Sequence, residues 1–297
     1  PLAMTGPRHR PEMTRAGLDP TRAVTVVDEF NEPREAMVAG ERPLTIYVDR
    51  RELVTLMTLG TSPEALTLGY LRNQALVASV EDILAIQVDW EVEAAAVTTR
   101  HGIEDWEEKL AHRTVTTGCG QGTVFGNIME DLDRISLPVP ALTQSGIYAL
   151  LNNLTRYNEV YRTAGAVHGC ALCRGEAILT FIEDVGRHNA ADAIAGLMWL
   201  DDTPGADKIF YTTGRLTSEM VIKVAQMGIP VLLSRSGVTH MGLELAARLG
   251  VTMVARAKGR HFLVYNGADT IAFDAMPDVP ESARRRGPLR RARATGE

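Results

Sequence analysis

Short apolar runs alternate with amphipathic stretches through the second half of the chain. The runs predict strands at residues 178–182, 209–212, 231–234, 251–255 and 262–265. The stretches between them predict helices at residues 189–200, 218–227 and 239–249. Strands that alternate with helices build layered domains around a sheet that is at least partly parallel. We therefore assign residues 141–275 to an α/β domain.

The first half of the chain has a different pattern, in which alternation of apolar and polar residues predicts strands at residues 23–27, 44–48, 53–59 and 94–99. One helix interrupts them, because Ser62-Pro63-Glu64 places an N-cap residue before a proline at the first helical position. A second turn begins near residues 79–82. Residues 23–115 are thus expected to form a smaller, β-rich N-terminal domain.

Three further segments carry no periodicity. Residues 1–22 and 276–297 are rich in proline and arginine, which predicts disordered tails, the second one basic. Residues 116–140 begin with glycines and end in Pro138-Val139-Pro140, which predicts a mobile loop and a linker between the domains.

The composition is that of a globular protein: 297 residues, 45% hydrophobic and 23% charged. A formal net charge of -6 argues against a general affinity for nucleic acid. No run approaches the roughly 20 apolar residues that cross a bilayer, so we expect a cytoplasmic protein that binds neither membrane nor nucleic acid. Three cysteines are too few for a disulfide framework and are expected to be thiols.

Basic residues follow four of the five strands predicted in the second half, those at residues 178–182, 209–212, 231–234 and 251–255. They are Arg187, Arg215, Arg235, Arg256, Lys258 and Arg260. Ligands of open α/β sheets bind beyond the carboxyl ends of the strands, and arginine suits phosphate oxygens. Each residue alone could be an ordinary surface arginine, but the set favours a phosphorylated ligand.

The cysteines lie in two settings. Cys119 stands in a run of glycines, which would let a persulfide-forming thiol move between a donor and an acceptor; it could also be a small residue in a tight loop. Cys170 and Cys173 form a C-x-x-C pair, which can mean zinc or redox chemistry. On a strand, however, they would point to opposite faces and be buried. The zinc deaminase signature, H-x-E followed by P-C-x-x-C, is absent, and we expect no metal bound by the protein itself.

Five segments together resemble a known family, the formate dehydrogenase accessory sulfurtransferases (FdhD). The resemblance covers roughly residues 23 to 270, and its most specific part is Glu183-Asp184-Val185-Gly186-Arg187-His188-Asn189, followed by Ala190 and Asp192. The other segments are Gly118-Cys119-Gly120, residues 165–168, Ser218-Glu219-Met220-Val221, and Lys258-Gly259-Arg260 before Val264-Tyr265.

The resemblance implies a sulfur carrier that takes persulfide sulfur from a cysteine desulfurase and passes it to the bis-molybdopterin guanine dinucleotide cofactor of formate dehydrogenase. It implies a C-terminal domain similar to cytidine deaminase but without zinc, and a homodimer. By position, Cys119 is the persulfide residue, and the cofactor-binding stretch is Ala255, Arg256, Ala257, Lys258, Gly259 and Arg260. Many relatives have C-x-x-C at the sulfur site, whereas this chain has Gly122 where the second cysteine would stand.

The remaining candidates for cofactor contact lie in the strand-end loops. They are Asp184, Arg187, His188 and Arg215. For Asp184, hydrogen bonds that fix the loop are the stronger interpretation, with Asn189 as the cap of the next helix. For His188, contact with a phosphate or base and a place in the core are equally open. Two other functions remain as alternatives to sulfur transfer: a chaperone that delivers the cofactor without moving sulfur, and a nucleotide-binding protein unrelated to molybdenum.

Overall fold

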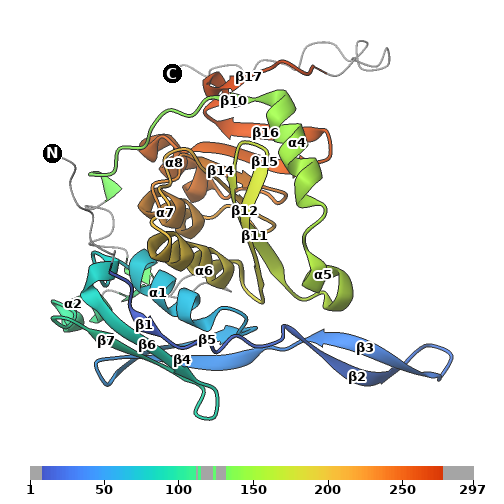
Figure 1. The fold of residues 1–297 in the computed structure, drawn as a ribbon. Helices are drawn as coiled ribbons and strands as arrows, with labels where there is room; N and C mark the ends of the chain where they lie inside the picture. Colours follow the sequence, from blue (N-terminus) through green and yellow to red (C-terminus); the bar gives the residue numbers. More distant parts are fainter. Residues whose placement is uncertain (1–8, 112, 115–122, 125–131, 277–297) are drawn as a thin grey trace, which may run out of the picture.

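The computed structural model describes residues 9–111, 113–114, 123–124 and 132–276. The largest sheet has the strand order β12-β11-β13-β14-β15-β16 (Figure 1). Its strands are β11 (His168–Arg174), β12 (Ala177–Asp184), β13 (Ile209–Thr212), β14 (Val231–Ser234), β15 (Thr252–Lys258) and β16 (His261–Asn266). β13, β14 and β15 are parallel, β11 is antiparallel to both of its neighbours, and β16 is antiparallel to β15. The expected mixed α/β domain is thus present.

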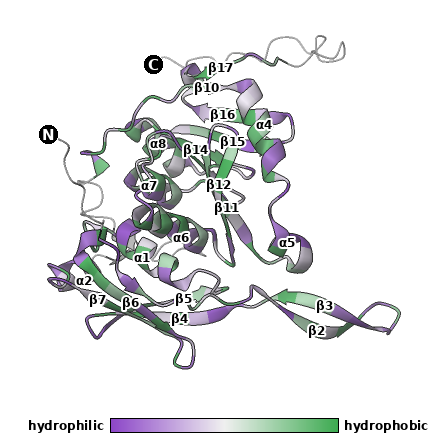
Figure 2. Cartoon of the chain, in the orientation of Figure 1, coloured by the Kyte–Doolittle hydropathy of each residue, from purple (hydrophilic) through white to green (hydrophobic). Residues whose placement is uncertain are grey.

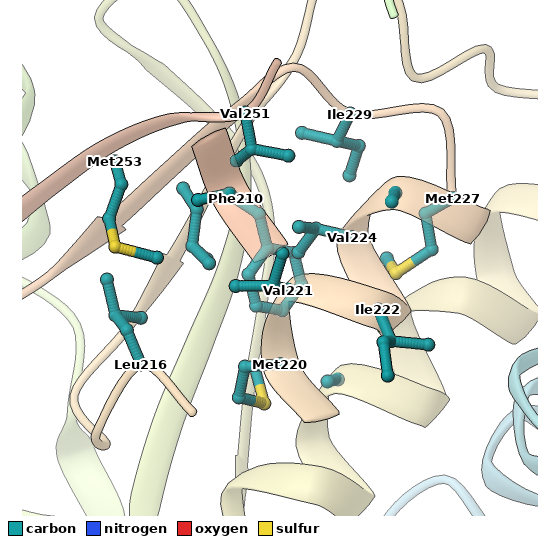
Figure 3. Packing of buried hydrophobic residues seen from close by; sticks show 14 of the residues in the cluster. Phe210, Leu216, Met220, Val221, Ile222, Val224, Met227, Ile229, Val251 and Met253 are labelled. Carbon is teal, nitrogen blue, oxygen red and sulfur yellow. The ribbon is translucent and has the colours of Figure 1, made fainter. Parts of the chain in front are cut away.

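Helices cover both faces of this sheet. α6 (Arg187–Leu200), α7 (Ser218–Gln226) and α8 (His240–Leu249) lie on one face, and α4 (Gln144–Leu154) and the short α5 (Glu159–Ala164) on the other (Figure 1). Phe210 of β13 is fully buried among Val221 and Val224 of α7 and Met253 of β15 (Figure 3). A second core lies under α4 and includes Leu150, Tyr211 and Val254. The likeness to cytidine deaminase stays a prediction.

The first half of the chain forms a separate sheet with the order β1-β6-β7-β4-β5. Its strands are β1 (Glu12–Met13), β4 (Arg42–Val48), β5 (Arg51–Thr58), β6 (Ile83–Asp89) and β7 (Ala94–Thr99). α1 (Pro63–Asn73) covers the sheet and begins with the expected proline. A turn of 3-10 helix, Val80–Asp82, follows Ser79, whose hydroxyl accepts from the Glu81 backbone. The β-rich character predicted for this half is therefore confirmed.

Smaller elements complete the described chain. β2 (Thr21–Val27) and β3 (Pro33–Ala39) form a hairpin that projects from the body of the molecule in Figure 1. α2 (Trp106–Ala111) follows β7, and two short pairs join β8 (Arg113–Thr114) with β9 (Thr123–Val124) and β10 (Leu142–Thr143) with β17 (Ile271–Ala272). Leu132, within the segment predicted to be a linker, is buried in the core between the large sheet and α6, α7 and α8.

The two halves meet where α1 crosses α6. At Gly69 of α1 an added Cβ would lie 1.5 Å from the Asp192 carbonyl oxygen, and at Gly196 of α6 one would lie 2.0 Å from the Ala65 carbonyl oxygen. Real Cβ atoms do not approach backbone so closely, so these glycines let the two helix backbones touch. The contact fixes the small sheet against the large domain, as the blue and olive helices of Figure 1 show.

Two sequence expectations, the disordered N-terminal tail and the Asn189 cap, need correction. Residues 9–22 were expected to be a disordered tail, but β1 pairs with β6 in parallel, and Glu64 accepts hydrogen bonds from Thr14 Oγ1 and the Ala16 backbone, each at 2.7 Å. α6 begins at Arg187, with Gly186 as its N-cap. Asn189 is therefore inside the helix, where its amide donates to the Met57 carbonyl at 2.6 Å instead of capping.

Apolar residues in Figure 2 gather on the inner strands and on the helix faces turned toward them. Within the described part of the chain, no helix combines the length and the apolar character needed to span a membrane.

Candidate functional site

The carboxyl ends of four strands meet at one edge of the large sheet. β12 and β13 both run antiparallel to β11, and β14 and β15 follow β13 in parallel, so all four end on the same side. His168, the first residue of β11, lies at this edge and pairs in register with Asp184. The basic loops expected from the sequence are therefore brought together here.

Two buried hydroxyls hold the middle loops. Thr212, at the end of β13, accepts from the Gly214 backbone at 3.1 Å. Ser234, at the end of β14, donates to the Gly214 carbonyl at 2.6 Å and accepts from the Ser236 backbone at 2.9 Å. The Ser236 carbonyl in turn accepts from the Arg256 backbone at 2.9 Å. The loops after β13, β14 and β15 thus form one connected rim.

Arg187 starts α6 and is only 5% exposed. Its side chain passes directly over Gly214, where an added Cβ would lie 2.3 Å from Arg187 Cδ. A glycine is required at this point because the arginine occupies the space that a side chain would need. Arg187 is thus held between the β12 and β13 loops.

Three arginines act electrostatically on His168, which is half-buried. Burial lowers the pKa of His168, and the charges of Arg187, Arg235 and Arg215 lower it further. Its Nδ1 lies 3.2 Å from the hydroxyl of Thr213. Arg215 and Arg235 are exposed, so this cluster opens to solvent. Arg187 at the start of α6 and two arginines of separate loops therefore act electrostatically on one imidazole, a setting suited to an anion.

The segment from Ala255 to Arg260 alternates between core and surface. Ala255 and Ala257 are 0% and 2% exposed, in the cores on opposite faces of the sheet. Arg256 interrupts the register with a φ of 53° and lies beside Gly237, whose added Cβ would be 3.8 Å from Arg256 Nε. Lys258, Gly259 and Arg260 form the exposed turn into β16. Within the predicted cofactor-binding stretch, residues 255–260, only Arg256, Lys258 and Arg260 have side chains that are long and exposed enough to reach a ligand.

A cavity of about 260 Å³ adjoins this turn, between α4, α5 and the end of β15. Its lining includes three tyrosines, Tyr157, Tyr161 and Tyr211, and three cations, Arg162, Arg235 and Lys258. Tyr157 stacks on Phe181 with ring centroids 5.1 Å apart, and the Arg235 guanidinium lies 5.7 Å from the Tyr161 ring centroid. Arg235 therefore joins the cavity to the His168 cluster.

A second cavity, of about 430 Å³, lies on the other side of the same turn, next to α4. Arg260 lines it and lies 5.3 Å from the ring centroid of Tyr148. Lys258 and Arg260 thus line two neighbouring cavities. The sequence did not lead us to the tyrosines that line the two cavities, because only residues at strand ends were considered. The spacing of Tyr157 and Tyr161, four residues apart, was the signal that could have identified them.

Asp184 and His188 point into the protein. The Asp184 carboxylate accepts from Thr58 Oγ1 at 2.6 Å and from the backbones of Leu59 and Val185 at 3.0 and 2.7 Å. Burial raises its pKa to about 6. His188 Nε2 lies 3.0 Å from the Glu219 carboxylate of α7, and both side chains are buried. The loop-fixing interpretation of Asp184 and the core interpretation of His188 fit these contacts.

Behind His188 lies a buried ionic network between the helices. Asp192 Oδ1 accepts from Lys223 Nζ and from Asn73 Nδ2, both at 2.8 Å, so the network links α6 with α7 and with α1. These side chains are buried and lie within the helix layer, away from solvent.

Cys119 lies outside the described residues. Cys170 and Cys173 are both fully buried, and their side chains lie in the cores on opposite faces of β11, as the strand alternation predicts. Burial raises the pKa of each thiol to about 12. Neither is suited to act as a thiolate nucleophile near neutral pH. Among the described residues no three side chains are grouped to hold a metal ion.

Comparison with known proteins places this arrangement in context. The FdhD/NarQ family model matches residues 39–272. A relative from Listeria monocytogenes (strain F2365), named sulfur carrier protein FdhD, is 31% identical over 241 residues, which are 80% of this chain and 92% of that protein. The relative of the same name from Bacillus subtilis (strain 168) is 26% identical over 82% of this chain and 93% of its own length.

A solved crystal structure also resembles this chain. The crystal structure of a protein from Desulfotalea psychrophila, designated a formate dehydrogenase accessory protein, matches with a TM-score of 0.67 and 26% identity. The match covers 85% of this chain and 98% of that chain. With the family model spanning most of the two sheets, the chain belongs to the FdhD/NarQ family.

Proposed function

We propose that this protein is a sulfur carrier for the maturation of formate dehydrogenase. It accepts sulfur on Cys119 from a cysteine desulfurase and passes it to a bis-molybdopterin guanine dinucleotide cofactor bound at the basic edge of the large sheet. Two relatives that span most of the chain are named sulfur carrier proteins. The observation that carries the ligand half of the proposal is the cation cluster around His168, continuous through Arg235 with a tyrosine-lined cavity.

The sulfur steps balance as two displacements. In the first, the Cys119 thiolate attacks the outer sulfur of the donor's persulfide, the donor's S–S bond breaks, and the donor cysteine leaves as a thiolate. In the second, the cofactor supplies an electron pair to the outer sulfur on Cys119, that S–S bond breaks, and the Cys119 thiolate returns. The first step needs a thiolate nucleophile and the second releases one, and the raised pKa values of Cys170 and Cys173 leave Cys119 as the candidate.

The ligand half depends on charge and on aromatic surface. A guanine dinucleotide carries phosphates, which favour the exposed Arg215, Arg256 and Lys258, and flat rings, which favour stacking on Tyr157 or Tyr161. The described cavity of about 260 Å³ would hold part of such a molecule, because ligand pockets range from about 300 to 1,000 Å³. Guanosine diphosphate (GDP) is therefore a suitable probe for this end of the ligand.

Cys119→Ala tests the sulfur half. The purified protein is incubated with a cysteine desulfurase and cysteine, and mass spectrometry should locate one added sulfur atom on the Cys119 peptide. The variant should lose this mass and should fail to restore formate dehydrogenase activity in cells without the native gene, at equal amounts of folded protein. Cys173→Ala is the matched control and should keep both functions.

The alternative is a chaperone that binds and delivers the cofactor without moving sulfur. Full formate dehydrogenase activity with Cys119→Ala would favour that alternative and contradict sulfur transfer. The same proposal includes a homodimer, which light scattering of the purified protein checks.

A further inference from the structure

His168 occupies the centre of the basic edge, although neither the strand-end pattern nor the predicted cofactor stretch includes it. It is the first residue of β11 and lies between the loops that follow β12 and β13. Arg187 of α6, Arg215 of the β13 loop and Arg235 of the β14 loop all act electrostatically on its ring. A residue at the edge where these loops meet, under the influence of three cations, is well placed to respond when an anion binds there.

The hydrogen bonds around Thr213 define the resting state of this ring. The Thr213 hydroxyl oxygen accepts from the Gly169 backbone at 3.1 Å, and the same oxygen lies 3.2 Å from His168 Nδ1. The Thr213 hydroxyl can donate its proton to Nδ1, and in that tautomer the neutral ring carries its proton on Nε2. This arrangement suits a ring that the surrounding arginines keep uncharged.

The carboxylates near His168 are already engaged elsewhere. On β12, Asp184 accepts from Thr58 and Leu59 of the small sheet, and Glu183 accepts from the backbones of Val160 and Tyr161 at 2.9 and 3.0 Å. These bonds direct both carboxylates to groups other than the imidazole. Arginine charges therefore dominate the potential at His168 until a ligand brings negative charge.

We propose that His168 is a ligand-linked proton acceptor, which is neutral in the free protein and takes up a proton when a phosphate-bearing ligand binds among Arg187, Arg215 and Arg235. This inference rests on the proposed function, because it requires the anionic ligand at this edge. The bound phosphates cancel the charge of the arginines and favour the imidazolium.

Protonation also rearranges the Thr213 hydrogen bond. The new proton on Nδ1 is donated to the Thr213 oxygen, so the Thr213 hydroxyl turns and offers its own proton to the ligand. One proton taken up at His168 thus creates a positive charge and a neutral donor on the ligand side. Affinity for phosphates should rise as pH falls through the pKa of the bound state.

The test is calorimetric titration of the full-length protein with GDP. Titrations in two buffers of different ionisation enthalpy, at pH 6.5 and 7.5, measure the protons taken up on binding. His168→Asn keeps an acceptor near the Nδ1 position but cannot be protonated. His240→Asn is the control, because His240 is exposed on α8. The terminal phosphate of GDP titrates in the same pH range. Proton uptake at His168 is therefore measured as the difference in uptake between wild type and His168→Asn.

We expect wild type and His240→Asn to take up more protons than His168→Asn, and to gain about threefold to tenfold in affinity relative to it as pH falls by one unit. Carbon-13 spectra of the histidine rings should show the His168 pKa rising when GDP is added to wild type, a measurement that does not depend on the variant folding. GDP binding with equal proton uptake in all proteins would overturn this inference and leave the proposed function standing. A failure of GDP to bind would overturn this inference and also the cofactor-binding part of the proposed function.

Discussion

The loop after β12 and the turn between β15 and β16 lie at the same edge of the same sheet but face in opposite directions. Asp184, Arg187 and His188 of the first are 3–5% exposed, and the bonds described for Asp184 and His188 end on protein groups. Lys258 and Arg260 of the second are exposed beside cavities. Both were predicted to contact the cofactor, but most side chains of the first form a scaffold, whereas those of the second are open to solvent.

Burial explains the difference. A charged group inside a protein is costly unless hydrogen bonds or an opposite charge compensate it. The β12 loop meets this condition with Thr58 and Leu59 of the small sheet, and α6 meets it with Lys223 of α7. The β15 turn has no such requirement because water solvates its cations. Substitutions in the first region should therefore change stability, and substitutions in the second should change affinity.

The largest effect is expected where α6, which carries the inward loop, touches α1. In Gly196→Val the new side chain would meet the Ala65 carbonyl, so the two helices must separate. Overpacking usually costs about 1–3 kcal/mol, and a clash with backbone should cost about 3 kcal/mol or more. Urea unfolding measures the change.

Gly237→Ala is the control on the outward rim. Its new Cβ would find Arg256 Nε at 3.8 Å, which is ordinary contact. Its unfolding free energy should stay within about 0.5 kcal/mol of wild type. If both variants were equally stable, the helix contact would not hold the two halves together, and the distinction between scaffold and rim would fail.

From β12 to β16 the elements of the large domain follow closely from the sequence, whereas α4 and α5 were not predicted. β13 and β14 have the predicted bounds because short, buried, β-branched and aromatic runs between turns have few alternatives. α8 begins after Thr239, whose hydroxyl accepts from the Gly242 backbone, and ends at Gly250 in the left-handed conformation. β1 was not predictable in this way, since two residues carry no periodicity and its pairing partner lies about 70 residues further along the chain.

The site was predictable in part. Basic residues after four strands were predicted to gather at one edge of the sheet, and the structure brings them together there, because strands that run in the same direction end together whatever their side chains do. The direction of each side chain depended on distant partners: Asp184 meets Thr58, 126 residues away in sequence. Tyr157 and Tyr161, before and within α5, follow no predicted strand, so no rule about strand ends could find them. Resemblance added Cys119, which lies outside the described residues.

A pH dependence of stability should distinguish the inward loop from the outward turn. Burial raises the pKa of Asp184 from 3.8 to about 6. The folded protein therefore holds this proton more tightly than the unfolded chain, and the stability from Asp184 is full below pH 3.8 and is lost as pH rises through about 6. Relative to Asp184→Asn, wild type should lose roughly 2–3 kcal/mol between pH 4 and pH 7.

Chemical denaturation of both proteins across this pH range measures that difference, and other titrating groups cancel because the two proteins share them. A stability difference that does not change with pH would contradict a buried, proton-binding Asp184. Lys258→Ala should show the pH dependence of wild type, since its side chain is exposed.

The smallest effect on the free energy, and the one specific to binding, is expected at the outward turn. The double substitution Lys258→Ala, Arg260→Ala removes two exposed cations beside the cavities and should weaken GDP binding about tenfold, or about 1.4 kcal/mol, because exposed charges in water interact weakly. Its melting temperature should equal that of wild type.

Calorimetry at 50 mM and 500 mM salt extends the test: wild type should bind more weakly at high salt, and the variant should lose part of this dependence. The exposed Arg174→Ala, at the opposite end of β11, is the control for loss of a surface cation and should bind like wild type. If the double variant bound GDP with unchanged affinity and salt dependence, the β15 turn would be ordinary surface, and the contrast between a scaffold and a binding region would have to be drawn elsewhere along this edge.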